Sequence, residues 1–252
     1  DAVQVVAGRG VYGTVHGCRL GLGRPHAPGD DDGEALWLED ESGVLGLGLS
    51  PAFAINQRAL FLPTDAGNIL WECLSVVNDE AVNELNRRGG LDLIVISHPH
   101  FYAAMQAWSE AFGGIPILLH EADRRWVTRP AANIAFWHGD SHRLSEAVTL
   151  INTGGHFPGS TALHWKDGPR PGGALFSGDS PQVASDRRHV SFMYSYPNLI
   201  PLPPGQVRAM QARLAGYDFD DVYGYTWGRN IIGGGRAAVD ASFQRYLSAI
   251  AA

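Results

Sequence analysis

Short aliphatic runs alternate with amphipathic segments along most of this chain. The runs at 91–96, 113–119 and 147–153 are rich in Leu, Ile and Val and are bounded by glycine or polar residues, which is typical of buried strands. The segment from Asp79 to Arg88 begins with acidic residues, ends with basic ones and is followed by Gly89, which predicts a helix. Because strands alternate with helices, we predict an α/β fold.

The same pattern continues on both sides of these elements. A hairpin is predicted from the apolar segments 50–62 and 67–72, and an exposed loop is predicted at 136–142. Further strands are predicted at 161–165, 173–177 and 221–225, and helices at 205–214 and 236–250. We predict one domain over residues 45–252. Residues 1–44, rich in Gly, Pro and Asp, form an N-terminal segment to which the pattern assigns no structure.

Two histidines close the apolar run at 91–96. His98 and His100 are one residue apart on an extended segment, so both imidazoles project to the same side and can reach one cation. His156 in Gly-Gly-His and Asp179 in Ser-Gly-Asp also come at the ends of predicted strands. His98, His100 and His156 are therefore candidate ligands of one metal ion, with Asp179 as a fourth ligand or a nearby base. The alternative is that the first two histidines are solvated loop residues.

In order and local context, these four residues resemble the metallo-β-lactamase superfamily. Its ligands come as His-x-His-x-Asp-His, then Gly-His, then Gly-Asp, then a late His, and the resemblance extends from about Leu45 to the C-terminus. It implies a four-layer αββα sandwich. The chain has Tyr102 and Ala103 where the family has the Asp and His of its second metal site, and Trp227 where the late His is expected. The resemblance thus implies a mononuclear site with a degenerate second metal position.

Further residues are candidates for roles around that site. The segment 185–204 is long and rich in Arg, Tyr and Pro, and we predict that it covers the site as a lid or pocket wall. Its arginines could pair with a substrate carboxylate, or with Asp186 and solvent. His120 ends a predicted strand, either as a group beside the metal ligands or as a structural histidine. The candidate substrate-binding residues are Arg187, Arg188, Tyr194, Tyr196 and Trp227, and Tyr102 is a candidate catalytic hydrogen-bond donor.

Charge and composition narrow the class of partner. A formal charge of −7 and the lack of a basic run argue against nucleic acid as a partner. The sequence contains no apolar run of the roughly 18 residues that cross a bilayer, so we expect no membrane partner and a cytoplasmic location. The 2 cysteines, Cys18 and Cys73, do not make a disulfide framework. The expected partner is a small-molecule substrate, and a homodimer is compatible with the sequence.

The candidate ligands favour hydrolysis. Three neutral histidines around Zn²⁺ leave an open position for water, whose pKa falls to about 7 on the metal. The resulting hydroxide could attack an ester, thioester, lactone or amide carbonyl, with Asp179 orienting the water or taking its proton. We therefore predict a metal-dependent hydrolase with one zinc ion. Two alternatives stay open, namely a mononuclear Fe(II) oxygenase on the same fold and a metal-free binding protein or non-hydrolytic enzyme.

Overall fold

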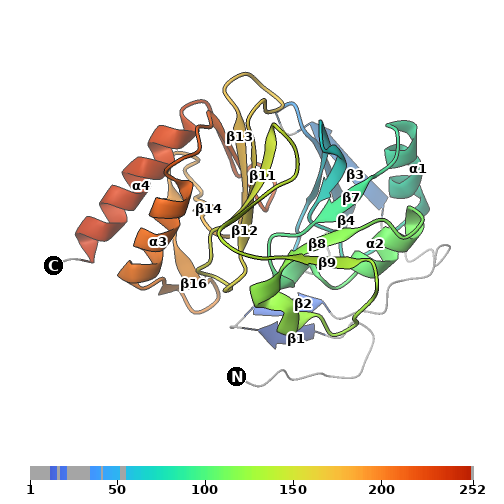
Figure 1. The fold of residues 1–252 in the computed structure, drawn as a ribbon, viewed down its shortest axis with the longest axis horizontal. Helices are drawn as coiled ribbons and strands as arrows, with labels where there is room; N and C mark the ends of the chain where they lie inside the picture. Colours follow the sequence, from blue (N-terminus) through green and yellow to red (C-terminus); the bar gives the residue numbers. More distant parts are fainter. Residues whose placement is uncertain (1–11, 16–17, 22–34, 41, 52–54, 251–252) are drawn as a thin grey trace.

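The fold consists of two central β-sheets packed face to face with helices on both outer faces (Figure 1). The structure is a computed structural model that describes residues 12–15, 18–21, 35–40, 42–51 and 55–250. The predicted four-layer αββα sandwich of the metallo-β-lactamase fold is confirmed. Within the N-terminal segment 1–44, residues 1–11, 16–17, 22–34 and 41 lie outside the described residues.

The first sheet has the strand order β3-β4-β5-β6-β7-β8-β9. Its first four strands are antiparallel, whereas β6 to β9 run parallel because helical crossovers connect them. The strands are β3 (Ala35–Asp40), β4 (Leu45–Ser50), β5 (Ala59–Thr64), β6 (Gly67–Trp71), β7 (Leu93–Val95), β8 (Ile117–His120) and β9 (Ile134–Trp137). The crossovers contain α1 (Asp79–Arg87), the 3-10 helix η1 (Pro99–Phe101), α2 (Met105–Ala111) and the 3-10 helix η2 (Glu121–Trp126).

The second sheet has the strand order β10-β11-β12-β13-β18-β19, and only the pair β13–β18 is parallel among its described ladders. Its strands are β10 (Ser141–Arg143), β11 (Val148–Asn152), β12 (Thr161–Trp165), β13 (Ala174–Gly178), β18 (Asp221–Gly224) and β19 (Asn230–Ile232). Helices α3 (Pro204–Leu214) and α4 (Gly235–Ala249) cover its outer face. The β13–β18 connection also carries the small hairpins β14 (Gln182–Val183) with β15 (Val190–Ser191), and β16 (Met193–Ser195) with β17 (Ile200–Pro201).

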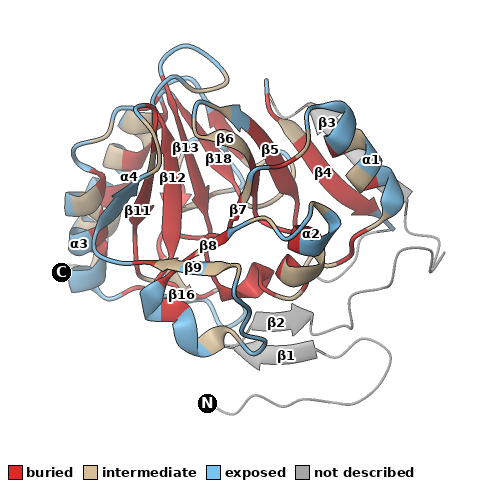
Figure 2. Cartoon of the chain, turned by 45° about the vertical axis from the view of Figure 1, so that its right-hand side comes forward, coloured by how far each residue is buried: buried red, intermediate tan, exposed pale blue. Residues whose placement is uncertain are grey.

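Three apolar clusters hold the layers together. One lies between the first sheet and its helices, one between the two sheets, and one between the second sheet and α3 and α4. Figure 2 shows the central strands buried and the outer faces of α1 and α3 exposed. Burial of large side chains supplies most of the stabilisation of such a fold. Representative members are Leu85 and Trp108 in the first cluster, Trp71 and Phe176 in the second, and Met210 and Phe243 in the third.

The structure differs from the predicted elements at the edges of both sheets. The prediction of an exposed loop at 136–142 is wrong at both ends of this segment, which belong to the edge strands β9 and β10, whereas residues 138–142 are exposed as predicted. All three residues of β10 are exposed, so no alternation of buried and exposed positions marks the strand. At the other end of the first sheet, β3 pairs with β4 and extends this sheet into the segment 1–44. That segment also contains the hairpin of β1 (Tyr12–Val15) and β2 (Cys18–Gly21). Among the described residues, no helix has the length and apolar character needed to span a membrane.

Candidate metal centre

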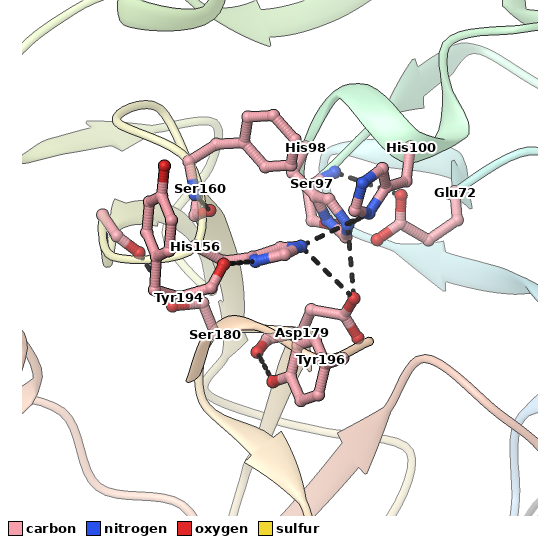
Figure 3. A network of polar contacts seen from close by, with 12 residues as sticks. Glu72, Ser97, His98, His100, His156, Ser160, Asp179, Ser180, Tyr194 and Tyr196 are labelled. Carbon is pink, nitrogen blue, oxygen red and sulfur yellow. Dashed lines mark hydrogen bonds and ion pairs between the residues drawn. The ribbon is translucent and has the colours of Figure 1, made fainter. Parts of the chain in front are cut away.

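Four buried side chains converge where several strands end. His98 and His100 follow β7, with His100 inside η1, while His156 lies in the turn between β11 and β12 and Asp179 directly follows β13. None of the four exposes more than 5% of its surface. One ligand atom from each lies within 4.8 Å of the others (Figure 3). The fold therefore brings together the four residues that the sequence analysis proposed as metal ligands.

The distances show which atoms face one another. His98 Nε2 lies 3.0 Å from His100 Nδ1, which lies 3.3 Å from His156 Nε2. The Oδ2 atom of Asp179 is 3.4 Å from His98 Nε2 and 3.9 Å from His156 Nε2. The other carboxylate oxygen, Oδ1, is buried and has no hydrogen-bond partner among the described residues. Three imidazole nitrogens and one carboxylate are a donor set that zinc and iron both accept, so these residues fit a divalent metal ion.

Tyr194 and Tyr196, which follow β15, form hydrogen bonds with His156 and with the backbone of Asp179. His156 Nδ1 lies 2.8 Å from the backbone oxygen of Tyr194, and because a carbonyl only accepts, Nδ1 carries the proton. The lone pair of Nε2 is then directed into the cluster, as a metal ligand requires. The hydroxyl of Tyr196 donates to the backbone oxygen of Asp179 at 2.5 Å, and its ring packs against His156 at 5.3 Å between centroids. Tyr194 and Tyr196 thus support the cluster, and their predicted contact with substrate stays a prediction.

His98 is held by a second pair of residues. Its Nδ1 lies 2.7 Å from Ser97 Oγ, while the Ser97 backbone N–H donates to Glu72 Oε2 at 3.1 Å. With Nε2 facing the cluster, Nδ1–H donates to Ser97 Oγ, and Glu72 holds the Ser97 backbone that carries this acceptor.

Glu72 is a residue of the site that sequence reasoning missed. It is buried directly after β6, and burial is the main cause that raises the pKa of its carboxyl to about 7, against the opposing effects of His98 and Ser97. The available signal was a charged residue that ends the apolar run 67–72. A buried carboxyl at a strand end, beside a histidine pair, is a candidate for holding one of those histidines.

Asp123 is a second buried carboxyl that the sequence did not reveal. Its Oδ1 accepts from the Gly159 backbone N–H at 2.9 Å, in the turn that carries His156. A Cβ at Gly159 would lie 2.7 Å from the Asp123 carboxyl carbon, so the turn packs directly on this side chain. Burial is the main cause that raises the pKa of Asp123 to about 6. Asp123 therefore ties η2 to the turn of His156.

Tyr102 and His120 lie in different surroundings. Tyr102 is buried in the apolar cluster of α1 and α2, and burial raises the pKa of its phenol well above the ordinary range, with Asp123 adding to the effect. Its catalytic role stays a prediction. His120 Nδ1 accepts from the Ala122 N–H at 3.1 Å and caps η2, while Nε2 lies 3.1 Å from the backbone oxygen of Gly139. These contacts favour the structural role among the two proposed for His120.

The remaining candidates lie on turns. Arg187 and Arg188 are exposed in the turn between β14 and β15, where Asp186 accepts the Arg188 backbone N–H at 2.9 Å. Trp227 lies in the turn between β18 and β19, and its indole packs so closely on Gly48 that a Cβ there would overlap with it. Arg187, Arg188 and Trp227 do not belong to the cluster of His98, His100, His156 and Asp179. Their contact with substrate stays a prediction.

Comparison with known proteins gives one relative by sequence and many by structure. No family model matches the chain. The uncharacterized protein YmaE of Bacillus subtilis (strain 168) is 37% identical over 212 residues, which cover 84% of this chain and 77% of YmaE.

Three solved structures illustrate the structural likeness. The metallo-β-lactamase DIM-1 is 13% identical with a TM-score of 0.60, over 84% of this chain and 95% of DIM-1. The protein TTHA1623 in a di-iron-bound form is 19% identical with a TM-score of 0.54, over 76% and 96% of the two chains. The Flv1 flavodiiron core from Synechocystis sp. PCC6803 is 14% identical with a TM-score of 0.60, over 85% and 61%. The chain thus belongs to the same family as YmaE and has the metallo-β-lactamase fold, with a buried cluster of three histidines and an aspartate suited to a metal ion.

Proposed function

We propose that this protein is a metal-dependent hydrolase that cleaves an ester, thioester, lactone or amide bond in a small molecule. The observation that carries the proposal is the convergence of His98 Nε2, His100 Nδ1 and His156 Nε2 on one buried point together with an Asp179 oxygen. The likeness to metallo-β-lactamases supports it at the level of the fold. Fold alone does not carry a reaction, so the proposal rests on the side chains.

The chain's own residues have distinct tasks in this reaction. When bound, the metal ion supplies Lewis acidity, which lowers the pKa of water and polarises a carbonyl group. The three histidines hold the ion in their neutral forms, and the Tyr194 carbonyl keeps His156 in the tautomer with Nε2 as ligand. Asp179 Oδ1 is the acceptor for a water proton. Because the cluster is buried, electrostatic interactions there act in a low dielectric and are stronger than they would be in water.

We expect one metal ion rather than two. Among the residues that the structure describes, these four make up the one cluster of three or more metal-ligating side chains. Tyr102 and Ala103 stand where the superfamily carries ligands of its second metal, and Tyr102 packs into the apolar cluster of α1 and α2. A phenol with a raised pKa is a poor replacement for a carboxylate or imidazole ligand.

The same donors favour a second candidate, a mononuclear iron oxygenase. Two histidines and one carboxylate on one side of a metal are the ligand set of such Fe(II) enzymes, which leave positions for O₂. Among the proteins of similar fold are a di-iron-bound form of TTHA1623 and a flavodiiron core. A zinc ion at this site would therefore be tested by hydrolysis assays, and an iron ion by assays of O₂ consumption.

The first test is the metal content of protein purified without a His tag and without added metal. His98→Ala removes a proposed ligand, and His142→Ala, on the exposed strand β10, is the matched control. We expect about one equivalent of metal in the wild type and in the control and none in His98→Ala. Equal metal in all three proteins, or none after reconstitution with zinc and with iron, would overturn the proposal and favour a metal-free protein.

The second test separates the two reactions. Zinc-loaded protein should hydrolyse members of a panel of esters, thioesters, lactones and amides at the same rate with and without O₂. Iron-loaded protein that consumes O₂ and leaves the panel intact would identify the oxygenase instead.

A further inference from the structure

A small polar pocket lies between the β14–β15 hairpin and the turn that joins β18 to β19. Its volume is about 270 Å³, and its lining includes Arg229, Ser185, Ser191, Thr226 and Gln182. We propose that this pocket binds a small oxyanion, such as a phosphate ion or a carboxylate group, with Arg229 as the cation. The proposal concerns a site separate from the four metal ligands, because none of them lines the pocket.

The backbone places this pocket at the same sheet edge as Asp179. In the parallel pair β13–β18, Gly178 pairs with Gly224, so Asp179 and Tyr225 leave the sheet side by side. Strand β14 begins three residues after Asp179, at Gln182, which pairs with Ser191 of β15. One wall of the pocket is therefore built on the same chain segment as the Asp179 carboxylate.

The other wall is the turn between β18 and β19, which packs closely against β14. The Gly224 backbone N–H donates to the Arg229 carbonyl oxygen at 3.0 Å, which closes this turn. A Cβ on Gly224 would lie 2.8 Å from that oxygen and 3.3 Å from the Val183 Cβ, so glycine lets the two hairpins approach. The close packing fixes the backbone that carries Arg229 beside the hydroxyls of Ser185 and Ser191.

The charge of the pocket is unusual for this chain. The chain carries a formal charge of −7, yet no Asp or Glu is among the described residues that line this pocket. The Arg229 side chain is partly buried, and its guanidinium has no hydrogen bond or ion pair with any described residue. By contrast, Arg213 pairs with Asp140 at 3.0 Å, and Arg170 pairs with Asp221 at 3.1 Å. Arg229 thus lines a pocket that contains no carboxylate from the described residues, and its guanidinium can bind an anion from solution.

The other polar groups and the size of the pocket define the ligand. Arginine presents a planar set of N–H donors that matches the oxygens of a carboxylate or phosphate, and the hydroxyls and the Gln182 amide supply further donors. A volume of about 270 Å³ is at or below the lower end of pockets for drug-sized ligands. The pocket therefore suits a free oxyanion or the acidic end of a longer molecule, and in the second case the inference rests on the proposed function.

Anion binding is tested on metal-free protein, so that the metal cannot act as a second anion site. Inorganic phosphate and acetate are titrated into the wild type, Arg229→Gln and Arg229→Lys, with Arg245→Gln on the exposed face of α4 as the matched control. We expect saturable binding in the wild type and the control, binding weaker by about tenfold or more in Arg229→Gln, and partial retention in Arg229→Lys. Circular dichroism verifies that each variant is folded. Absence of saturable binding in the wild type, or equal binding in wild type and Arg229→Gln, would overturn the proposal.

The source of the oxyanion is decided on metal-loaded enzyme with a matched pair of substrates, one neutral and one with a carboxylate. If the pocket holds the substrate's carboxylate, Arg229→Gln raises KM for the acidic member about tenfold or more and leaves the neutral member unchanged, and phosphate competes with the acidic member. If the pocket holds a free ion, phosphate binds at Arg229 and the two substrates respond equally to Arg229→Gln. Loss of the hydrolase proposal would leave the titration of metal-free protein intact, so the two failures are distinguishable.

Discussion

The Nδ1 atom of His156 lies 2.8 Å from the backbone oxygen of Tyr194, 38 residues further along the chain. This contact joins the turn between β11 and β12 to strand β16, and it selects the tautomer whose Nε2 faces the other histidines. The acceptor is a backbone oxygen, so the contact does not depend on the identity of the side chain at position 194. The segment after Asp179 thus contributes to the cluster through its main chain.

Removal of one candidate ligand should weaken zinc binding, whereas removal of a side chain outside the cluster should not. We expect His156→Ala to lower the affinity for zinc by at least about a hundredfold, because one of three nitrogen ligands is removed. Trp227→Ala should keep the affinity of the wild type, since the indole packs on Gly48 and lies outside the four clustered side chains. Competition with a chromophoric zinc chelator measures both values. A similar loss in the two variants would show that the effect of His156→Ala is a general loss of structure.

Glu72 should affect metal binding without being a ligand. Glu72→Gln replaces the negative carboxylate by a neutral amide with a single acceptor oxygen, next to Ser97, which is the hydrogen-bond partner of His98 Nδ1. Groups behind a metal ligand typically change metal affinity by about 10 to 100-fold, so we expect weaker zinc binding in this range with the fold intact. Glu146→Gln, at an exposed position, is the control. Unchanged zinc affinity in Glu72→Gln would mean that the Ser97 contact does not orient His98.

Asp123 should make stability fall as the pH rises. Burial raises the pKa of its carboxyl from 3.8 to about 6, so between these values the folded protein keeps a proton that the unfolded chain has released. The free energy of unfolding therefore decreases from about pH 4 to pH 6. Asp123→Asn retains an oxygen acceptor for the Gly159 N–H and carries no charge. We expect the variant to be more stable than the wild type at pH 7, by up to about 3 kcal/mol, and equal to it below the unfolded pKa.

Urea unfolding of metal-free protein at several pH values measures this difference. The comparison between variant and wild type cancels the titration of the other carboxyl groups, which both proteins share. A difference in stability that is constant from pH 4 to pH 7 would contradict the assignment to Asp123.

Arg58 should be important for the hairpin that carries Trp227 and Arg229. Its buried guanidinium donates to the Gly224 carbonyl at 2.6 Å and to Asn230 Oδ1 at 2.7 Å, at the two ends of this turn. Arg58→Met should lower the free energy of unfolding by about 2 to 4 kcal/mol, because two buried acceptors lose charged donors. Arg88→Met, at a partner of Glu84 on the surface, should change it by less than about 1 kcal/mol. Chemical denaturation compares the two variants, and equal effects would sink the assignment.

Much of the fold could be predicted from the order of residues along the chain. Helix α1 was predicted because acidic residues mark its start and basic residues and glycines mark its end. The buried strands β7, β11, β12 and β13 were predicted because each lies within an aliphatic run. Edge strands β9 and β10 were missed, since they are only 4 and 3 residues long and every residue of β10 is exposed, which leaves too little alternation of apolar and polar positions to mark them. Local sequence determines whether a segment is helical or extended only where one face must be apolar.

The four candidate ligands were predictable for a similar reason. Each of them follows a strand or lies in the turn after it, and β11 and β13 end at the same edge of their sheet because both are antiparallel to β12. The contacts around the ligands were not predictable. Glu72 reaches Ser97 across 25 residues, and Arg58 reaches Gly224 across 166 residues. Sequence alone therefore determined the buried central elements and the identity of the candidate ligands, because each of them is marked by a pattern in its own segment. Only the tertiary structure decided the partners and tautomers of the ligands and the position of the pocket, because these depend on packing between segments far apart in the chain.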